Sequence, residues 1–113
     1  NPSVPEVNVR EKQDEYVIEL AAPGLDKKDF NVDVQNNVLL ISSEKEDRNE
    51  QKDKKDNFLR REFSYSSFQR SFSLPEGVKP EDIKAKHENG VLYVSVPKKD
   101  ELKQKPSKKI EIE

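Results

Sequence analysis

The stretch KHENGVLYVSVPK, residues 86–98, joins a turn signal to a run of alternating apolar residues. The Asn-Gly pair at 89–90 is the strongest two-residue signal for a β-hairpin, because a type I′ turn needs a positive φ angle at both central positions. After this turn the chain alternates at the period of two that is typical of a half-buried strand, with Leu92, Val94 and Val96 on one face. The stretch therefore predicts an antiparallel hairpin whose second strand lines a core.

The same alternation recurs along the rest of the chain, whereas helical periodicity is hard to find. A second turn signal, Asn-Asn at 36–37, separates two further alternating runs and predicts another hairpin. Seven or eight short strands at these intervals are typical of an antiparallel β-sandwich. Besides the run after residue 90, strands are predicted at EVNVRE (6–11), EYVIEL (15–20), FNVDVQ (30–35), VLLIS (38–42), FQRSFSL (68–74) and around IKAK (83–86).

The composition limits the size and the class of the protein. With 113 residues the chain can form one domain, and its 31% hydrophobic and 39% charged residues place it near the border of what can fold. Such a lean core predicts that stability is shared with a partner chain, in a dimer or a larger oligomer. The net charge of −2 gives no field that would attract nucleic acid or an anionic membrane. No apolar stretch approaches the roughly 18 residues of a membrane span.

Few residues in the chain could carry catalysis or bind a metal. The absence of cysteine excludes disulfides, thiolate catalysis and cysteine-type zinc sites, and it suits a reducing cytoplasm. His87 is the only histidine, and between Lys86 and Glu88 it is interpreted as a surface residue. The sequence contains no nucleophile elbow, phosphate-binding glycine loop or EF-hand loop. We therefore predict no enzymatic activity, no cofactor and no metal site.

Two strongly charged segments interrupt the alternating pattern. In EKEDRNEQKDKKDN, residues 44–57, 11 of 14 residues are charged, which predicts a solvated and partly mobile loop. Residues 98–109 contain six lysines and two acids, which predicts a flexible and partly extended linker. The chain is accordingly divided into a domain over residues 1–97 and a C-terminal extension over residues 98–113.

The segment RREFSYSSFQRSF, residues 60–72, allows a second interpretation. Basic residues interleaved with aromatic ones can form a stacking platform for nucleic acid. The even spacing of the aromatic residues and the slightly negative net charge favour a sandwich core instead. A nucleic-acid-binding β domain therefore stays an alternative, and binding that falls steeply with salt would support it.

The last six residues, KKIEIE, end an otherwise polar tail with two apolar side chains. In an extended chain Ile110 and Ile112 point to the same face, about 7 Å apart. This is the pattern of a peptide that adds to the edge of a sheet. The alternatives are that the isoleucines form a last strand of the chain's own sheet or that they are frayed. If the tail reaches a neighbouring subunit, the contact is heterologous and builds rings or cages from dimers.

Four stretches resemble the small heat shock proteins of the bacterial or plant type, the HSP20 or α-crystallin domain family. NGVLYVSVPK (89–98) is similar to the G-V-L signature at the end of the α-crystallin domain, and Ile-Glu-Ile at 110–112 matches the C-terminal I-x-I motif. The segments at 17–45, which includes AAPGL, and at 68–78, FQRSFSLPEGV, resemble the family's earlier strands. Together these matches cover nearly the whole chain, and an N-terminal arm is expected to be missing.

The resemblance implies an immunoglobulin-like sandwich and an ATP-independent holdase that keeps unfolding client proteins from aggregating under stress. It implies a homodimer in which a strand from the 44–62 region pairs with the partner's first strand. Without the N-terminal arm we expect dimers or small assemblies and weakened activity. A p23-like co-chaperone or adaptor is the first alternative, although the I-x-I tail and the long loop argue against it.

The resemblance also assigns residues to two interfaces. The tail motif of Ile110 and Ile112 would dock between the strand FNVDV and the strand IKAKH of a neighbouring subunit. Alternation predicts four apolar residues for the floor of this groove, Val32, Val34, Ile83 and Ala85; the alternative is that they face the sandwich core. The dimer interface would include Val7, Val9, Phe58, Leu59 and Arg70, the last of which matches a basic position of the family's dimer region.

Overall fold

The computed structural model describes residues 5–52, 58–103 and 108–113, and the side chains among them except those of residues 47–52 and 58–65. Within these ranges the chain forms seven strands and three short 3-10 turns. The strands are β1 (Glu6–Glu11), β2 (Glu15–Ala21), β3 (Phe30–Gln35), β4 (Val38–Lys52), β5 (Phe58–Ser73), β6 (Lys84–Glu88) and β7 (Val91–Pro97). The 3-10 turns are η1 (Lys27–Asp29), η2 (Pro80–Asp82) and η3 (Asp100–Leu102).

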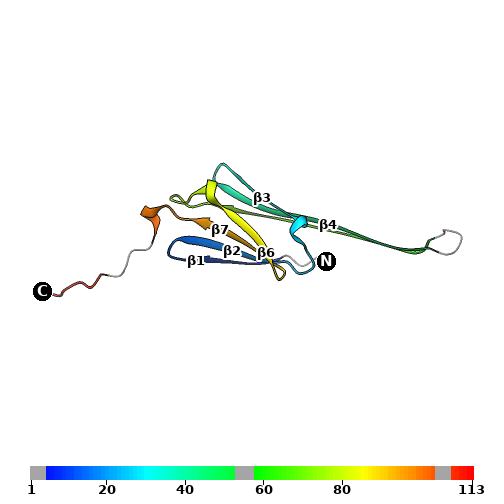
Figure 1. The fold of residues 1–113 in the computed structure, drawn as a ribbon, viewed down its shortest axis with the longest axis horizontal. Helices are drawn as coiled ribbons and strands as arrows, with labels where there is room; N and C mark the ends of the chain where they lie inside the picture. The colour runs from blue at the N-terminus through cyan, green and yellow to red at the C-terminus, as the bar shows by residue number, and fades with distance from the viewer. Residues whose placement is uncertain (1–4, 53–57, 104–107) are drawn as a thin grey trace.

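The strands form two antiparallel sheets that face each other (Figure 1). One sheet has the order β1-β2-β7-β6 and the other the order β3-β4-β5. Strands β1 and β6 are the edges of the first sheet, and β3 and β5 are the edges of the second. The predicted all-β antiparallel sandwich is therefore confirmed.

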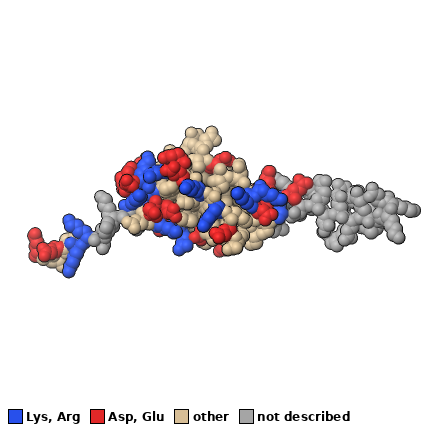
Figure 2. Space-filling model, viewed as in Figure 1, with Lys and Arg blue, Asp and Glu red and all other residues tan. Residues whose placement is uncertain are grey.

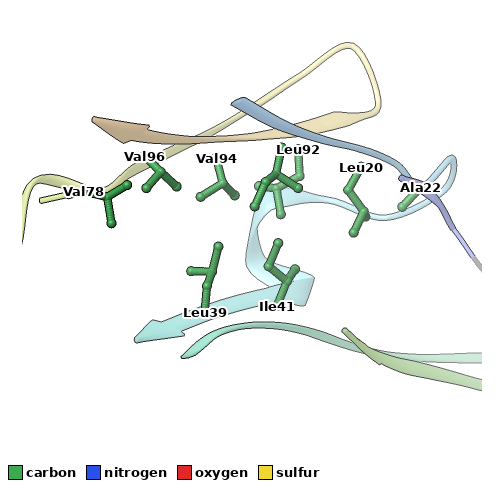
Figure 3. Packing of buried hydrophobic residues seen from close by; sticks show 9 residues of the cluster. Leu20, Ala22, Leu39, Ile41, Val78, Leu92, Val94 and Val96 are labelled. Atoms are coloured by element: carbon green, nitrogen blue, oxygen red, sulfur yellow. The ribbon is translucent and has the colours of Figure 1, made fainter. Parts of the chain in front are cut away.

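The core lies between the sheets and follows the alternation of the sequence (Figure 3). Leu92, Val94 and Val96 of β7 point inward, opposite Leu39 and Ile41 of β4. Leu39, Ile41 and Val94 have no exposed surface at all. Each such side chain contributes roughly 1.5–3 kcal/mol when it is fully buried, so a few alternating positions stabilise this small domain.

Both predicted hairpin turns are confirmed by their backbone angles. Asn89 and Gly90 have φ angles of 52° and 78°, and Asn36 and Asn37 have φ angles of 52° and 62°. These positive values are those that a type I′ turn requires at its two central residues. The turns fix the register, so that Ala85 lies opposite Val94 and Val34 lies opposite Leu39.

The charged segment after residue 43 differs from the predicted loop. Residues 44–52 continue β4, and they pair with β5 as far as Phe58, with an irregularity at Gln51/Lys52. This part of the β4–β5 hairpin projects beyond the sandwich (Figure 1), and we call it the β4–β5 arm. The prediction of a loop assumed that a strand must bury one face, but an antiparallel pair already satisfies half of its backbone groups by itself. Residues 53–57 lie outside the described residues.

The beginning of the predicted linker is also different, because residues 98–103 pack on the domain. Lys98 is only 1% exposed, and its ammonium group donates a 2.8 Å hydrogen bond to the backbone oxygen of Lys12. The same group lies 3.3 Å from the Glu11 carboxylate. Leu102 of η3 packs against the core next to Gly77. The C-terminal extension thus begins with a packed root, by which we mean residues 98–103.

Gly77 offers a test of this root. Its φ angle is +85°, and an added Cβ would lie 3.2 Å from two Leu102 carbon atoms. Gly90 has φ +78° with no atom within 4 Å of its Cβ position, so Gly90→Ala isolates the backbone cost of about 1–2 kcal/mol. Gly77→Ala is expected to lower the free energy of unfolding by more than Gly90→Ala, measured in urea. Equal losses would show that Leu102 moves away freely.

Candidate functional site

Strands β3 and β6 end their sheets on the same side of the sandwich. The rings of Phe30 on β3 and His87 on β6 are in contact, with their centroids 5.6 Å apart. Register places Val32 and Val34 on the core side of β3, and Ala85 on the core side of β6, because they lie opposite the buried residues Ile41, Leu39 and Val94. We call this border the β3–β6 edge, formed by Phe30, Val32, Val34, Ile83, Ala85 and His87.

The four residues predicted for the tail groove all lie at the β3–β6 edge, but they differ in exposure. Val32 and Ile83 are partly buried and pack against the core. Val34 is 39% exposed, and Ala85 is also exposed, although both face the core side of their strands. An exposed side chain on the inner face of an edge strand is accessible to an added chain. Val34 and Ala85 are therefore the open positions of this edge.

His87 is not the surface residue that the sequence suggested. It is half-buried against Phe30, and its Nε2 atom is buried without a hydrogen-bond partner among the residues that the structure describes. The alternation rule contained the signal, because His87 follows Ala85 by two positions and so shares its face. The interpretation was wrong because it considered only the adjacent charged residues.

The tail residues 108–113 are exposed. Ile110 is 81% exposed and Ile112 is 98% exposed. Figure 1 shows this end of the chain extending away from the sandwich. Residues 108–113 form no strand, so the alternative of a last strand in the chain's own sheet is not seen in this structure. Two apolar side chains are left uncovered.

An exposed ion pair lies at the root of the extension. The Lys103 ammonium group is 2.9 Å from the Asp100 carboxylate. The hydrogen bond from Lys103, with its positive charge, lowers the pKa of the Asp100 carboxyl below its ordinary value. The same hydrogen bond raises the pKa of Lys103. Both groups are open to solvent, so this pair contributes little to holding η3 in place.

Strands β1 and β5 border the opposite side of the sandwich, which we call the β1–β5 edge. A cavity of about 500 Å³ joins Glu6 of β1 to Ser66 and Phe68 of β5, with Ala21 and Leu25 among its other walls. Val9 is 58% exposed although it lies opposite Ile18 on the core side of β1, and Val7 packs against the core. This edge of the first sheet is therefore open and partly apolar.

The predicted interface residues lie along the β1–β5 edge as far as they are described. Arg70 is exposed on β5 opposite Ile41, and its guanidinium carbon is 5.6 Å from the centre of the Phe72 ring. Phe58 and Leu59 begin β5, and their side chains lie outside the described residues. The structure thus brings Val7, Val9 and Arg70 to one side of the sandwich.

A metal site, a nucleic-acid surface or a membrane span would each need particular features among the described residues. Among the residues whose positions are described, no group of three or more His, Asp or Glu side chains could hold a metal ion. Basic and acidic residues are interspersed on the face that Figure 2 shows, rather than gathered in a region of one sign. The coloured part of this face therefore shows no basic stripe of the kind typical of nucleic-acid-binding domains. None of the described helices is long and apolar enough to cross a membrane.

Comparison with known proteins shows which family shares this sequence and this β-sandwich. The sequence pattern of the Hsp20/alpha crystallin family matches residues 8–113. Small heat shock protein C2 of Rickettsia felis is 38% identical over 109 residues, which cover 96% of this chain and 68% of that protein. The 17.4 kDa class I heat shock protein of Arabidopsis thaliana is 44% identical over 98 residues, which cover 86% of this chain and 62% of that protein.

A solved structure extends the likeness to the whole chain. A small heat-shock protein from Xylella fastidiosa superposes with a TM-score of 0.66 at 27% identity, covering 100% of this chain and 99% of that chain. The match includes both the sandwich and the extension that carries Ile110 and Ile112. The chain belongs to the Hsp20/alpha crystallin family of small heat shock proteins.

Proposed function

We propose that this protein is an ATP-independent holdase, which binds unfolding client proteins and keeps them from aggregating. The observation that carries the proposal is the open β3–β6 edge, where Val34 and Ala85 stay exposed on the inner faces of their strands. Binding of an unfolded chain needs accessible apolar surface, and surrounding charge keeps the complex in solution. No step in this function requires a nucleotide or a catalytic group.

The holdase works as a homodimer formed by strand exchange at the β1–β5 edge. Strand β1 pairs with β2 on one side only, so its other side presents unpaired backbone groups. The β4–β5 arm projects beyond the sandwich and supplies strand that can reach a second chain (Figure 1). Exposed Val9 and Arg70 lie along the same edge. Pairing with the partner's arm would cover this border.

Dimers assemble further when the tail of one chain binds the β3–β6 edge of another. The tail isoleucines are exposed, and Val34 and Ala85 are open on the receiving edge. Strand addition of this kind gains backbone hydrogen bonds and places alternate side chains in apolar positions. The absence of cysteine suits a reducing compartment, and we place the protein in the cytoplasm.

Light scattering of a heat-labile client enzyme tests the holdase directly. With no nucleotide present, the chain at a near-stoichiometric ratio is expected to lower the scattering on heating measurably but not completely, because its β3–β6 edge covers apolar segments of the client. An equal mass of an inert protein is the control. Unchanged scattering at severalfold excess of the chain would contradict the proposal.

A matched pair of variants tests whether the β3–β6 edge contributes to client binding. Val34→Asp adds a charge to an open inner-face position of β3, where desolvating it would weaken apolar binding. Gln35→Asp adds the same charge to the next position of β3, which is exposed on the other face. We expect Val34→Asp to weaken suppression severalfold and Gln35→Asp to leave it nearly unchanged. Equal effects would show that net charge, and not the β3–β6 edge, governs activity.

A further inference from the structure

The tail and strand β6 carry charge patterns that complement each other. In the tail, Lys109, Glu111 and Glu113 alternate with the two isoleucines. In β6, Lys84 and Lys86 face outward, because they lie opposite Ser95 and Tyr93 on the outer face of β7. Glu88 follows at the next outward position. Tail docking itself belongs to the proposed function, on which the following inference rests.

The strand period determines where the tail charges go. A tail that adds to the free side of β6 with its isoleucines toward the core must direct residues 109, 111 and 113 to the outer face. That face is the one that carries Lys84, Lys86 and Glu88. Residues directly opposite each other on one face of a sheet interact, and like charges there are destabilising. The charges can therefore select both the direction and the register of the tail.

We propose that the tail of a second copy of this chain binds antiparallel to β6, with Glu113 opposite Lys84, Glu111 opposite Lys86 and Lys109 opposite Glu88. All three pairs then have opposite charges. On the inner face, Ile112 lies opposite Ala85, whose small side chain leaves room for it. Ile110 lies opposite His87, beside the Phe30 ring.

Neighbouring antiparallel registers lose this complementarity. A shift of two residues in one direction places Glu111 opposite Glu88, and a shift in the other places Lys109 opposite Lys86. Each shift brings like charges together, which costs stability instead of adding it. Odd shifts would turn the isoleucines to the charged face. The antiparallel alignment is thus restricted to one register.

One parallel register also pairs opposite charges, with Glu111 at Lys84 and Glu113 at Lys86. Its third pair would need Asp82, which belongs to the 3-10 turn Pro80–Asp82 and not to a strand. The antiparallel register keeps all three partners within β6 (Lys84–Glu88). A regular ladder favours the antiparallel direction for this reason.

The charged side chains of β6 are available for ion pairs with the tail. Lys84 makes no ion pair with any residue that the structure describes. Lys86 is 3.5 Å from Glu88, and their side chains are 70% and 59% exposed, so both are still hydrated. Figure 2 shows the charges of the tail at the end of the chain, where basic residues are followed by acidic ones. The tail extends from its own domain, which presents it to another copy (Figure 1).

Charge reversal with compensation tests the direction. Glu111→Lys places two lysines opposite each other, and we expect it to weaken association between dimers about five- to tenfold at ~0.02 M salt. Adding Lys86→Glu to the same chain is expected to restore most of this loss, whereas adding Lys84→Glu should weaken association further by facing Glu113. Sedimentation velocity over a concentration series measures the effect, which should shrink at ~0.5 M salt. Rescue by Lys84→Glu instead would overturn the antiparallel direction.

Cross-linking provides a second readout, since the chain has no cysteine of its own. We expect a mixture of the Glu113→Cys and Lys84→Cys variants to form a disulfide between two chains under mild oxidation. Glu113→Cys mixed with Lys86→Cys is the control for the parallel register and should form far less. A preference for the control pair, or no mixed disulfide at all, would overturn the proposal.

The Ile110→Ala, Ile112→Ala chain separates this inference from tail docking itself. If that chain dissociates while Glu111→Lys assembles normally, docking stands and the charge register is wrong. If neither change affects assembly, or if the unaltered chain never exceeds its smallest species, docking fails and the register fails with it. Client suppression is measured separately and does not depend on either outcome.

Discussion

Replacing Ile110 and Ile112 together by alanine is expected to abolish assembly beyond the dimer and to leave the fold intact. The two side chains are 81% and 98% exposed, so the domain gains almost nothing from them. On docking, each would lose apolar surface to the β3–β6 edge, for about 1.5 kcal/mol or more per side chain. Together they account for roughly 3 kcal/mol, which corresponds to a loss in affinity of more than a hundredfold.

Sedimentation velocity and thermal unfolding of the same samples measure the two halves of this prediction. The double variant Ile110→Val, Ile112→Val is the matched control, because it keeps branched apolar side chains and should retain most of the assembly. Unfolding temperature should stay within error for both chains. A clear drop in the alanine chain would show that the isoleucines complete the chain's own sheet, contrary to their exposure.

The parts of the fold that could be predicted are those with local causes. The period of two that includes Leu92, Val94 and Val96 depends only on which face of a strand is buried. The Asn-Gly pair at 89–90 depends only on backbone conformation, and both signals can be read without knowledge of the partner strand. The prediction of seven or eight short strands followed from these signals, and the structure forms seven within the residues that it describes.

The β4–β5 arm could not be recognised from burial patterns. Sequence interpretation treats a stretch of charged residues as a loop because no face of it can enter a core. Backbone pairing between residues 44–52 and β5 is independent of any core, so the usual signal is absent. The length of the stretch was the available clue, since loops of this length are uncommon in compact domains.

The β3–β6 edge could be predicted only in part, because alternation gives the face of a strand on which a residue lies but not how exposed that residue is. Alternation grouped Val32, Val34, Ile83 and Ala85 together, but it could not show that Val32 and Ile83 pack against the core while Val34 and Ala85 stay open. Exposure at a sheet edge depends on how far the opposite sheet extends, which is a property of the assembled sandwich. The contact of His87 with Phe30 depends on the same tertiary arrangement.

The packed root of the extension is the least predictable feature, because it requires a buried lysine. Lysine is almost never fully buried unless it is paired, and nothing near Lys98 in the sequence indicates a partner. Its partners come from the end of β1, which is Glu11, and from the turn after it, where Lys12 is 86 residues away in sequence. The Tyr16 ring also contributes, since the Lys98 ammonium group lies 4.8 Å from its centre.

Lys98→Ala is expected to lower the free energy of unfolding by about 2–3 kcal/mol, because it removes a buried side chain together with its hydrogen bond to Lys12. Lys98→Met keeps most of the volume and removes only the polar contacts. Its cost should be about 1 kcal/mol, since Glu11 is 48% exposed and water can replace its lost partner. Urea unfolding measures both changes in free energy, provided that the slope of the unfolding free energy against urea concentration is the same for each variant.

The comparison decides what the buried lysine contributes. If Lys98→Met is as damaging as Lys98→Ala, the ammonium group and not the packed stem holds the root in place. Hydrogen exchange at the Leu102 amide, which is bonded to the Lys99 carbonyl, then reports whether the root loosens before the domain unfolds. A loosened root would widen the range of directions in which the tail leaves the domain. In that case Lys98→Ala would also weaken assembly, although neither isoleucine has changed, because less of the population would present the tail in a docking geometry.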